Sequence, residues 1–316
     1  MKLYRGYSLV ELLVTIAIML LVLSAVYLTY ISLLKGYKKE GSIGSKIIEE
    51  QIGLEIIRKD ILLAGLGIEA NISPVSISGG GDNITLTLLT TQMVSSDKLQ
   101  GYLMLKFDNN TNNWNVLLDK RVNTTNNNIV VIDGNRKKWT TGTINSNAIS
   151  QSAPYPENNY IAFGYPLETL LSSYNTIEYK LGGTPPSRCN PSTKNLIRNG
   201  QIVVNCVKGF KVYFGADTNN DGSIDSFYDN LSVGVFDNSS KIYENLQLIS
   251  FYILTHEGNK DKNYNYGSDT VNFYDNDIGA NVSFSLSGVS DYTRYRWKVL
   301  KVSSKTINIR GVGLSD

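Results

Sequence analysis

One long apolar segment dominates the N-terminal part of the chain. From Leu12 to Leu34 there is no charged residue, no proline and no glycine, and most positions hold Leu, Val, Ile, Ala or Met. About 20 residues in a helix cross a bilayer. Three lysines follow the segment, at positions 35, 38 and 39. The pattern therefore predicts a membrane-spanning helix over residues 7–35.

A helical pattern continues beyond these lysines. Apolar residues recur at steps of three, four and seven, which places them on one face of a helix. They are Ile43, Ile47, Leu54, Ile57, Ile61 and Ala64. The polar face is expected to hold Glu49, Glu50, Glu55, Arg58 and Lys59. Gly65 and Gly67 are stop signals. Residues 36–66 are thus predicted to be the amphipathic half of the same helix. The helix is expected to be softened at Gly36, Gly41 and Gly44.

From about residue 68 the hydrophobic period changes to two, which is typical of strands. The alternating segments are 84–88, 102–107, 177–181, 282–286, 295–302 and 306–310. Clusters of Asn, Gly, Asp and Ser separate them and favour turns. We predict an α+β fold in which the long helix packs on an antiparallel β-rich domain of residues 67–316. The region 109–156 is either part of one elaborated domain or an insertion.

The composition removes several classes of function. The chain has 30 Lys and Arg against 28 Asp and Glu, so its net charge gives no case for nucleic-acid binding by the whole protein. The net charge does not exclude a local basic patch that binds nucleic acid. His256 is the only histidine, which excludes a zinc site with two His ligands. Two cysteines are too few for an iron–sulfur cluster.

Little in the sequence suggests an enzyme. There is no Walker-type loop. Asp275 and Asp277 fit a loop tip better than acid–base chemistry, because nothing near them in the sequence completes a site. His256 is expected at a strand end or turn, as an ordinary surface or capped histidine. We expect no catalytic activity.

The apolar segment by itself admits two ordinary interpretations. A secretory signal peptide has an apolar region of ~7–15 residues and a small-residue cleavage site, whereas this segment is longer and no Ala-x-Ala-like site follows it. A plain membrane anchor explains the hydrophobicity but not Glu11. A carboxylate in a spanning helix costs ~2.5–3.5 kcal/mol at the centre and less near the interface. Glu11 therefore calls for a function and a partner.

The segment Gly6-Tyr7-Ser8-Leu9-Val10-Glu11-Leu12-Leu13 resembles the processing and methylation site of type IV prepilins. Members of that family have a short basic leader that ends in Gly, usually Phe as the first mature residue, and Glu as the fifth. Here residues 1–6 would be the leader, and Glu11 is the fifth residue counted from Tyr7. Tyr7 in place of Phe is one departure. A spanning segment without proline is another.

The resemblance implies a mechanism of assembly. A prepilin peptidase would cut after Gly6 and methylate the amine of Tyr7. The helix would wait in the inner membrane, with the β-rich domain outside, before it enters a cell-surface pilus. Glu11 would pair with the Tyr7 ammonium of a neighbouring subunit, which offsets the cost of burying both charges. Such a head-to-tail contact does not close, so it builds a filament. The implied partners are other pilins, the peptidase and the pilus assembly machinery.

Residues 217–225 read Asp-Thr-Asn-Asn-Asp-Gly-Ser-Ile-Asp. Oxygen-bearing side chains at alternate positions are typical of an EF-hand-type calcium loop. The candidate ligands are Asp217, Asn219, Asp221, Ser223 and Asp225. Gly222 stands where such a loop turns sharply. Tyr228 replaces the closing Glu, so Asp229 would have to close the site or the affinity would be low. A plain Asn/Asp/Gly turn uses the same residue types, but the alternation favours structural calcium.

The surroundings of this loop narrow the resemblance. The segment Val212-Tyr213-Phe214-Gly215-Ala216-Asp217 and a basic strand near the C-terminus resemble the PilW group of minor pilins. Asp60-Ile61-Leu62-Leu63-Ala64-Gly65 resembles the end of their long helix. The likeness is strongest over residues 1–66 and 177–230. It implies a minor pilin that primes, caps or decorates a type IV pilus.

Two other functions share these features. A minor pseudopilin of a type II secretion system would have the same leader, glutamate and helix. A pilus-tip adhesin or DNA-uptake component would need a binding face, for which the basic residues of the last strand are candidates. These are Arg294, Arg296, Lys298, Lys301 and Lys305.

Cys189 and Cys206 flank a polar stretch of 16 residues. Outside the inner membrane two cysteines at this separation are expected to pair. On the chain-entropy model such a bridge contributes ~3 kcal/mol. Two buried free thiols are the alternative.

Overall fold

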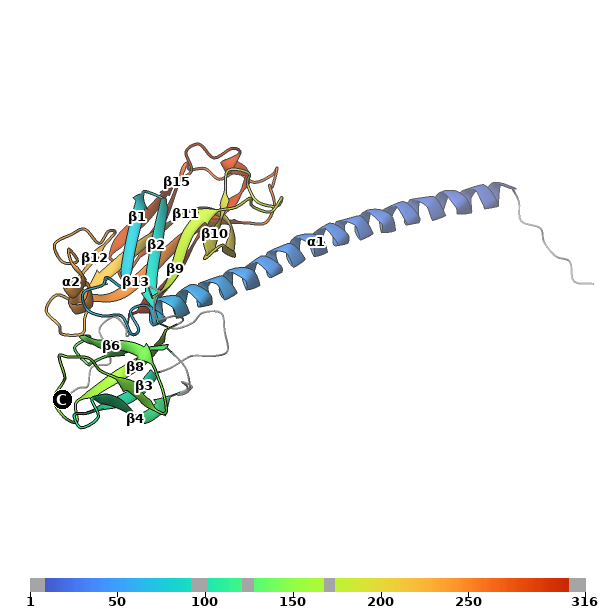
Figure 1. Ribbon diagram of the computed structural model, residues 1–316. Helices are drawn as coiled ribbons and strands as arrows, with labels where there is room; N and C mark the ends of the chain where they lie inside the picture. The colour runs from blue at the N-terminus through green and yellow to red at the C-terminus, as the bar shows by residue number, and fades with distance from the viewer. Residues whose placement is uncertain (1–8, 92–101, 121–127, 168–173, 307–316) are drawn as a thin grey trace, which may run out of the picture. The chain divides into compact units, whose positions relative to one another are not determined.

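The computed structural model describes residues 9–91, 102–120, 128–167 and 174–306, and it divides into two units. The first unit ends at Ile48 and the second begins at Glu49. Helix α1 (Leu9–Leu63) contributes to both (Figure 1). Because α1 passes through Gly36, Gly41 and Gly44 without a break, the softening expected there produces no interruption of the helix.

In the first unit the described residues are helical throughout. The 26 residues of Leu9–Leu34 are long and apolar enough to cross a membrane, and none of them is buried within the chain. Their aliphatic composition, free of proline and glycine, explains the unbroken helix.

The second unit is built around an eight-stranded sheet. The strand order is β1-β2-β9-β10-β11-β13-β16, with β12 beside β11. The strands are β1 (Val75–Gly80), β2 (Asn83–Thr90), β9 (Asn175–Gly182), β10 (Lys194–Arg198), β11 (Gln201–Ala216), β12 (Ser226–Tyr228), β13 (Leu246–Glu257) and β16 (Arg296–Lys305). All neighbours along this order pair antiparallel. A short helix α2 (Ser239–Asn245) precedes β13.

The two longest strands, β11 and β13, have buried residues on both faces. On one side the core joins Ile57 and Ile61 of α1 to Phe210 and Phe251 of the sheet. On the other side lies a second core, which includes Tyr252 and the two-stranded sheet of β14 (Thr270–Asp275) and β15 (Ala280–Ser285). A 3₁₀ turn, η1 (Tyr292–Arg294), precedes β16.

Between β2 and β9 the chain forms a separate six-stranded sheet. Its order is β6-β5-β8-β3-β4-β7. The strands are β3 (Tyr102–Asp108), β4 (Asn113–Lys120), β5 (Asn128–Ile132), β6 (Lys138–Thr143), β7 (Ala148–Ser150) and β8 (Ile161–Leu167). This sheet has its own core, in which Phe107 and Trp114 are fully buried. The insertion interpretation therefore applies, and the inserted element is wider than residues 109–156.

The predicted α+β class is confirmed: an N-terminal apolar helix is followed by a β-rich unit of mostly antiparallel sheets. The period-two segments 84–88, 102–107 and 177–181 lie in β2, β3 and β9. Segments 282–286 and 295–302 overlap β15 and β16. Most of the segment predicted at 306–310 lies outside the described residues.

Candidate functional site

The candidate polymerisation site is the start of α1. Glu11 stands in its first turn, where the partial positive charge of the helix N-terminus favours a carboxylate. Its side chain is exposed, as are those of Leu9, Val10 and Leu12 around it. Gly6 and Tyr7, the predicted cleavage and methylation residues, lie outside the described residues. An acidic group is thus set in an exposed apolar surface.

Three hydroxyl-bearing residues of the apolar segment donate hydrogen bonds to the backbone of their own helix. The hydroxyl groups of Thr15 and Ser24 donate to the carbonyl groups of Leu12 and Leu21, each at 2.8 Å. Thr29 donates in the same way, four residues back along the helix. Such local bonds lower the cost of placing hydroxyl groups in an environment without water. Apart from two tyrosines, Glu11 is the only ionisable residue in the Leu9–Leu34 span.

The second half of α1 is attached to the sheet through carboxylates as well as apolar side chains. Asp60 is buried and receives two hydrogen bonds from the Arg198 guanidinium, one of them Nη2 to Oδ1 at 2.9 Å. The hydroxyl of Tyr179 also donates to Asp60. Burial alone would lower the pKa of Arg198, but the hydrogen bonds and charge of Asp60 raise it. Burial first, and Asp60 second, raise the pKa of Tyr179.

Two glutamates placed on the solvent face by the sequence pattern also face the sheet. Glu49 accepts from Arg188 at 2.7 Å, and Glu50, whose residue is only 4% exposed, pairs with Lys298 at 2.8 Å. The expected polar face was therefore wrong for these two residues. The reason is long-range: Arg188, in the loop between β9 and β10, and Lys298 of β16 face the helix, and their charges make it favourable to turn the carboxylates inward.

The opposite face of α1 is partly apolar. Ile52 is 58% exposed and Ile56 is 37% exposed, beside the exposed ion pair of Glu55 and Arg58. Of the apolar residues predicted to face the domain, Ile57, Ile61 and Ala64 are fully buried, so the prediction was right for these three.

The disulfide prediction is confirmed. Cys189 and Cys206 are joined, and both residues are buried. His256, the penultimate residue of β13, lies against this bridge: one of its ring nitrogens and the two sulfur atoms are within 4.8 Å of one another. The backbone N–H of Asn190 donates to its Nε2 at 2.9 Å. His256 is thus near a strand end and capped, as expected, but it is buried, not on the surface.

The segment of residues 217–225 forms a tight turn held by its own side chains. Asp217 is buried, and its Oδ2 accepts from the backbone N–H of Gly222 at 3.0 Å and from Gln247. Gly222 has a φ of +89°, which only glycine adopts easily. Asn219 Oδ1 accepts from the N–H of Asp221, and Asp221 Oδ1 from that of Ser223. These bonds turn the chain around the acidic side chains.

Two carboxylates of this loop, those of Asp221 and Asp225, accept hydrogen bonds from the same amide group. The amide nitrogen of Asn219 donates to Asp221 at 3.1 Å and to Asp225 at 3.4 Å. Hydrogen bonds from the Thr218 hydroxyl and backbone lower the pKa of Asp225. Carboxylate and amide oxygens are the ligands that Ca²⁺ prefers, so the side chains of this loop fit a hard cation. Asp229 has other neighbours: it accepts from Asn230 and lies near Tyr213.

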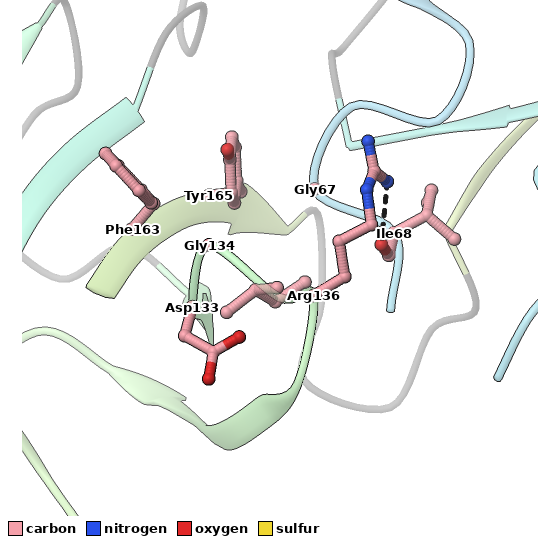
Figure 2. A pocket seen from close by; sticks show the side chains of 8 residues that line it. Gly67, Ile68, Asp133, Gly134, Arg136, Phe163 and Tyr165 are labelled. Carbon is pink, nitrogen blue, oxygen red and sulfur yellow. Dashed lines mark hydrogen bonds between the residues drawn. The ribbon is translucent and has the colours of Figure 1, made fainter. Parts of the chain in front are cut away.

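A small pocket lies where the inserted sheet meets Gly67 and Ile68, in the segment that follows α1 (Figure 2). Its volume is about 30 Å³, enough for water but not for an organic ligand. Arg136 donates to the carbonyl groups of Gly65 at 2.8 Å and Ile68 at 3.2 Å, and it lies over the ring of Tyr243. Burial lowers the pKa of Arg136. The site attaches the inserted sheet to the chain that follows α1, and sequence patterns gave no sign of it.

Residues 1–27 match the family model described as the prokaryotic N-terminal methylation motif. This range contains Gly6, Tyr7, Glu11 and most of the apolar segment. Neither the curated proteins nor the solved structures compared with the chain show a significant match. The motif supports a type IV pilin-like protein that a prepilin peptidase processes and that has pilins as partners.

Proposed function

We propose that this protein is a minor pilin, cut after Gly6 and methylated on Tyr7, that helps to prime, cap or decorate a type IV pilus. The observation that carries the proposal is the methylation motif of residues 1–27 on a helix whose apolar surface is exposed from Leu9 to Leu34. Exposed apolar area of this extent must be covered, since burial stabilises by about 25 cal/mol per Å². The inner membrane covers it first and neighbouring pilin helices cover it in the filament.

In this proposal Glu11 guides docking. Removal of the leader leaves a new amine on Tyr7, four residues before Glu11. In the filament the Glu11 carboxylate of one subunit pairs with the Tyr7 ammonium of a neighbour. A charge left without a partner in an apolar core would cost several kcal/mol. The pair therefore penalises wrong registers as a subunit enters the filament.

The size of the second unit favours a low copy number. Residues 49–316 carry the eight-stranded sheet and the inserted six-stranded sheet. A head of this size is difficult to repeat along a tightly packed shaft, which supports a place near the tip. The resemblance of the 217–229 loop to the PilW group of minor pilins also supports a low copy number. The head would lie outside the inner membrane and then at the cell surface.

We also propose that the 217–229 loop binds calcium in a structural role. Asp217, Asn219, Asp221, Ser223 and Asp225 would hold the ion, which would supply charge neutralisation and rigidity. The role of the whole protein would be structural, not enzymatic. His256 and the two cysteines, the residues with the most catalytic potential, are buried and engaged in contacts of the fold.

The test is intact-mass spectrometry of the protein from membranes and from sheared filaments. We expect loss of residues 1–6, one methyl group on Tyr7, and a small amount of protein in the filament fraction. Glu11→Ala should be processed yet stay in membranes. Glu55→Ala is the matched control, because it removes an exposed carboxylate from the same helix. An uncut chain would overturn the proposal. Processed protein found only with a type II secretion system would favour the pseudopilin alternative.

A further inference from the structure

Lys301 of β16 lies between two aspartates on the side of the large sheet that faces β14 and β15. Its Nζ is 2.8 Å from Oδ1 and 2.6 Å from Oδ2 of Asp275, the last residue of β14. It also contacts the carboxylate of Asp277. Tyr252 is the register partner of Lys301 on β13, so the two side chains leave the sheet on the same face.

Asp275 and Asp277 differ in their surroundings. The Asp275 side chain is 3% exposed and that of Asp277 is 64% exposed. Each oxygen of Asp275 has a second donor: the backbone N–H of Asp277 donates to Oδ1 at 2.8 Å, and the hydroxyl of Tyr252 donates to Oδ2. The carboxyl carbon of Asp275 is therefore held between two polarising donors, in direct contact with an amine.

We propose that Lys301 and Asp275 condense to form an intramolecular amide, which joins β16 to β14. Asp277 takes a proton from the Lys301 ammonium and passes it to Oδ2 of Asp275, which leaves a neutral amine beside a neutral carboxyl group. Nζ then attacks Cγ of Asp275, and the backbone N–H of Asp277 stabilises the oxyanion on Oδ1. A second proton passes from the attacking nitrogen through Asp277 to the Oδ2 hydroxyl, which leaves as water, while Tyr252 stays protonated throughout. The balance is one ammonium and one carboxylate to one amide and one water, with no oxidant or co-reactant.

Two physical factors favour the amide over the ion pair. The reacting groups are held in contact, and well-oriented intramolecular groups have effective molarities of ~10⁵–10⁸ M. Water is largely excluded around Asp275, since the ring of Tyr252 packs on those of Phe273 and Tyr213, with centroids at 6.0 and 5.5 Å. Burial alone would lower the pKa of Lys301, but Asp275 and Asp277 raise it. Burial alone would raise the pKa of Asp275, but Lys301 and Tyr252 lower it. The first proton transfer, from Lys301 to Asp275, therefore costs free energy.

The amide would close a loop between residues 275 and 301 and tie the small sheet covalently to the edge of the large one. Such a bond would resist pulling and proteolysis in an extracellular head. The inference does not depend on pilus assembly, since it concerns only contacts inside the second unit.

The test is mass spectrometry of the full-length protein purified in detergent, reduced before analysis. The expected intact mass is one water lighter than the processed sequence. Trypsin should release residues 263–294 and 299–305 as one joined peptide, because an acylated Lys301 is not cut. Recovery of the two segments as separate peptides, with Lys301 cut and no water lost, would overturn the proposal.

Variants separate this bond from other losses of water. Lys301→Arg should restore the full mass, and Asp277→Asn should leave most of the protein unreacted. Lys298→Arg is the matched control: Lys298 lies on the same strand between Glu257 and Glu50, and its replacement should leave the water loss unchanged. Water loss that persists in Lys301→Arg would also contradict the proposal. If Lys301→Arg does not fold, the wild-type peptide pattern still decides.

Discussion

Asp60 of α1 and Arg198 of β10 form a buried two-point ion pair across 138 residues of sequence. Their side chains are 4% and 11% exposed. Because Tyr179 of β9 donates to the same carboxylate, one acidic group of the helix joins two neighbouring strands. The pair fixes both the rotation and the height of the helix against the sheet, which apolar contacts alone would define less sharply.

Removing one partner of this pair should be costly. Asp60→Ala leaves a buried guanidinium without its carboxylate, and we expect a loss of ~3–5 kcal/mol of unfolding free energy. Denaturant unfolding of the detergent-solubilised protein measures it. Glu55→Ala, which breaks an exposed pair on the same helix, should have a much smaller effect. The double variant Asp60→Leu with Arg198→Leu should recover part of the loss. Equal losses for Asp60→Ala and Glu55→Ala would contradict this role.

Gly53 allows α1 to approach the β10–β11 hairpin closely. A Cβ at this position would lie 2.5 Å from the carbonyl oxygen of Val203, a backbone atom that cannot move aside easily. We expect Gly53→Ala to lower the unfolding free energy by ~1–3 kcal/mol. The matched variant is Gly41→Ala, where nothing lies within 4 Å and a gain in helix propensity is expected. Thermal unfolding of the two variants checks the contrast, and a neutral Gly53→Ala would argue against close packing.

Alkaline pH should destabilise the second unit through its buried tyrosines. Burial, with Asp60 second, raises the pKa of Tyr179, and burial also raises that of Tyr243. In the unfolded chain both hydroxyls titrate near pH 10. Their contribution to stability is therefore complete below about pH 10 and decreases as the pH rises above it, because the unfolded state loses these protons first.

The measurement is the unfolding free energy as a function of pH, with tyrosinate absorbance recorded in parallel. Tyr179→Phe should weaken the alkaline dependence, although it also removes a hydrogen bond to Asp60. Tyr155→Phe, at an exposed position, should leave the dependence unchanged. A stability that is constant from neutral to strongly alkaline pH would be inconsistent with buried hydroxyls.

Calcium should stabilise the protein through the 217–229 loop. Free calcium at about 100 times its dissociation constant would add ~2.7 kcal/mol, because only the folded loop binds. Thermal melts with calcium and with a chelator measure the shift. Asp221→Asn and Asp225→Asn should abolish it. Asp237→Asn, at an exposed acid paired with Lys241, should retain it. Identical melts of the wild type with and without calcium would reject the site.

The sequence by itself determined the elements whose signals are local. The apolar run to Leu34, the helical spacing after it and the period-two strands follow from nearest-neighbour chemistry, and the α+β class follows from them. The motif around Glu11 is also local, since its residues are adjacent in the chain. The pairing of Cys189 with Cys206 was accessible because the chain offers only one pair.

Tertiary structure decided the features that depend on distant partners. The sequence pattern placed Glu49 and Glu50 on the polar face of the helix and gave no sign that Asp60 is buried. In the structure all three face the sheet. Their partners come from strands and loops more than a hundred residues away, and an opposite charge offsets much of the cost of turning a carboxylate inward. The same holds for Lys301 with Asp275 and for the separate sheet of residues 102–167. No pattern within one segment encodes which strand will become its neighbour, because that choice is made by burying the whole set of apolar faces at once.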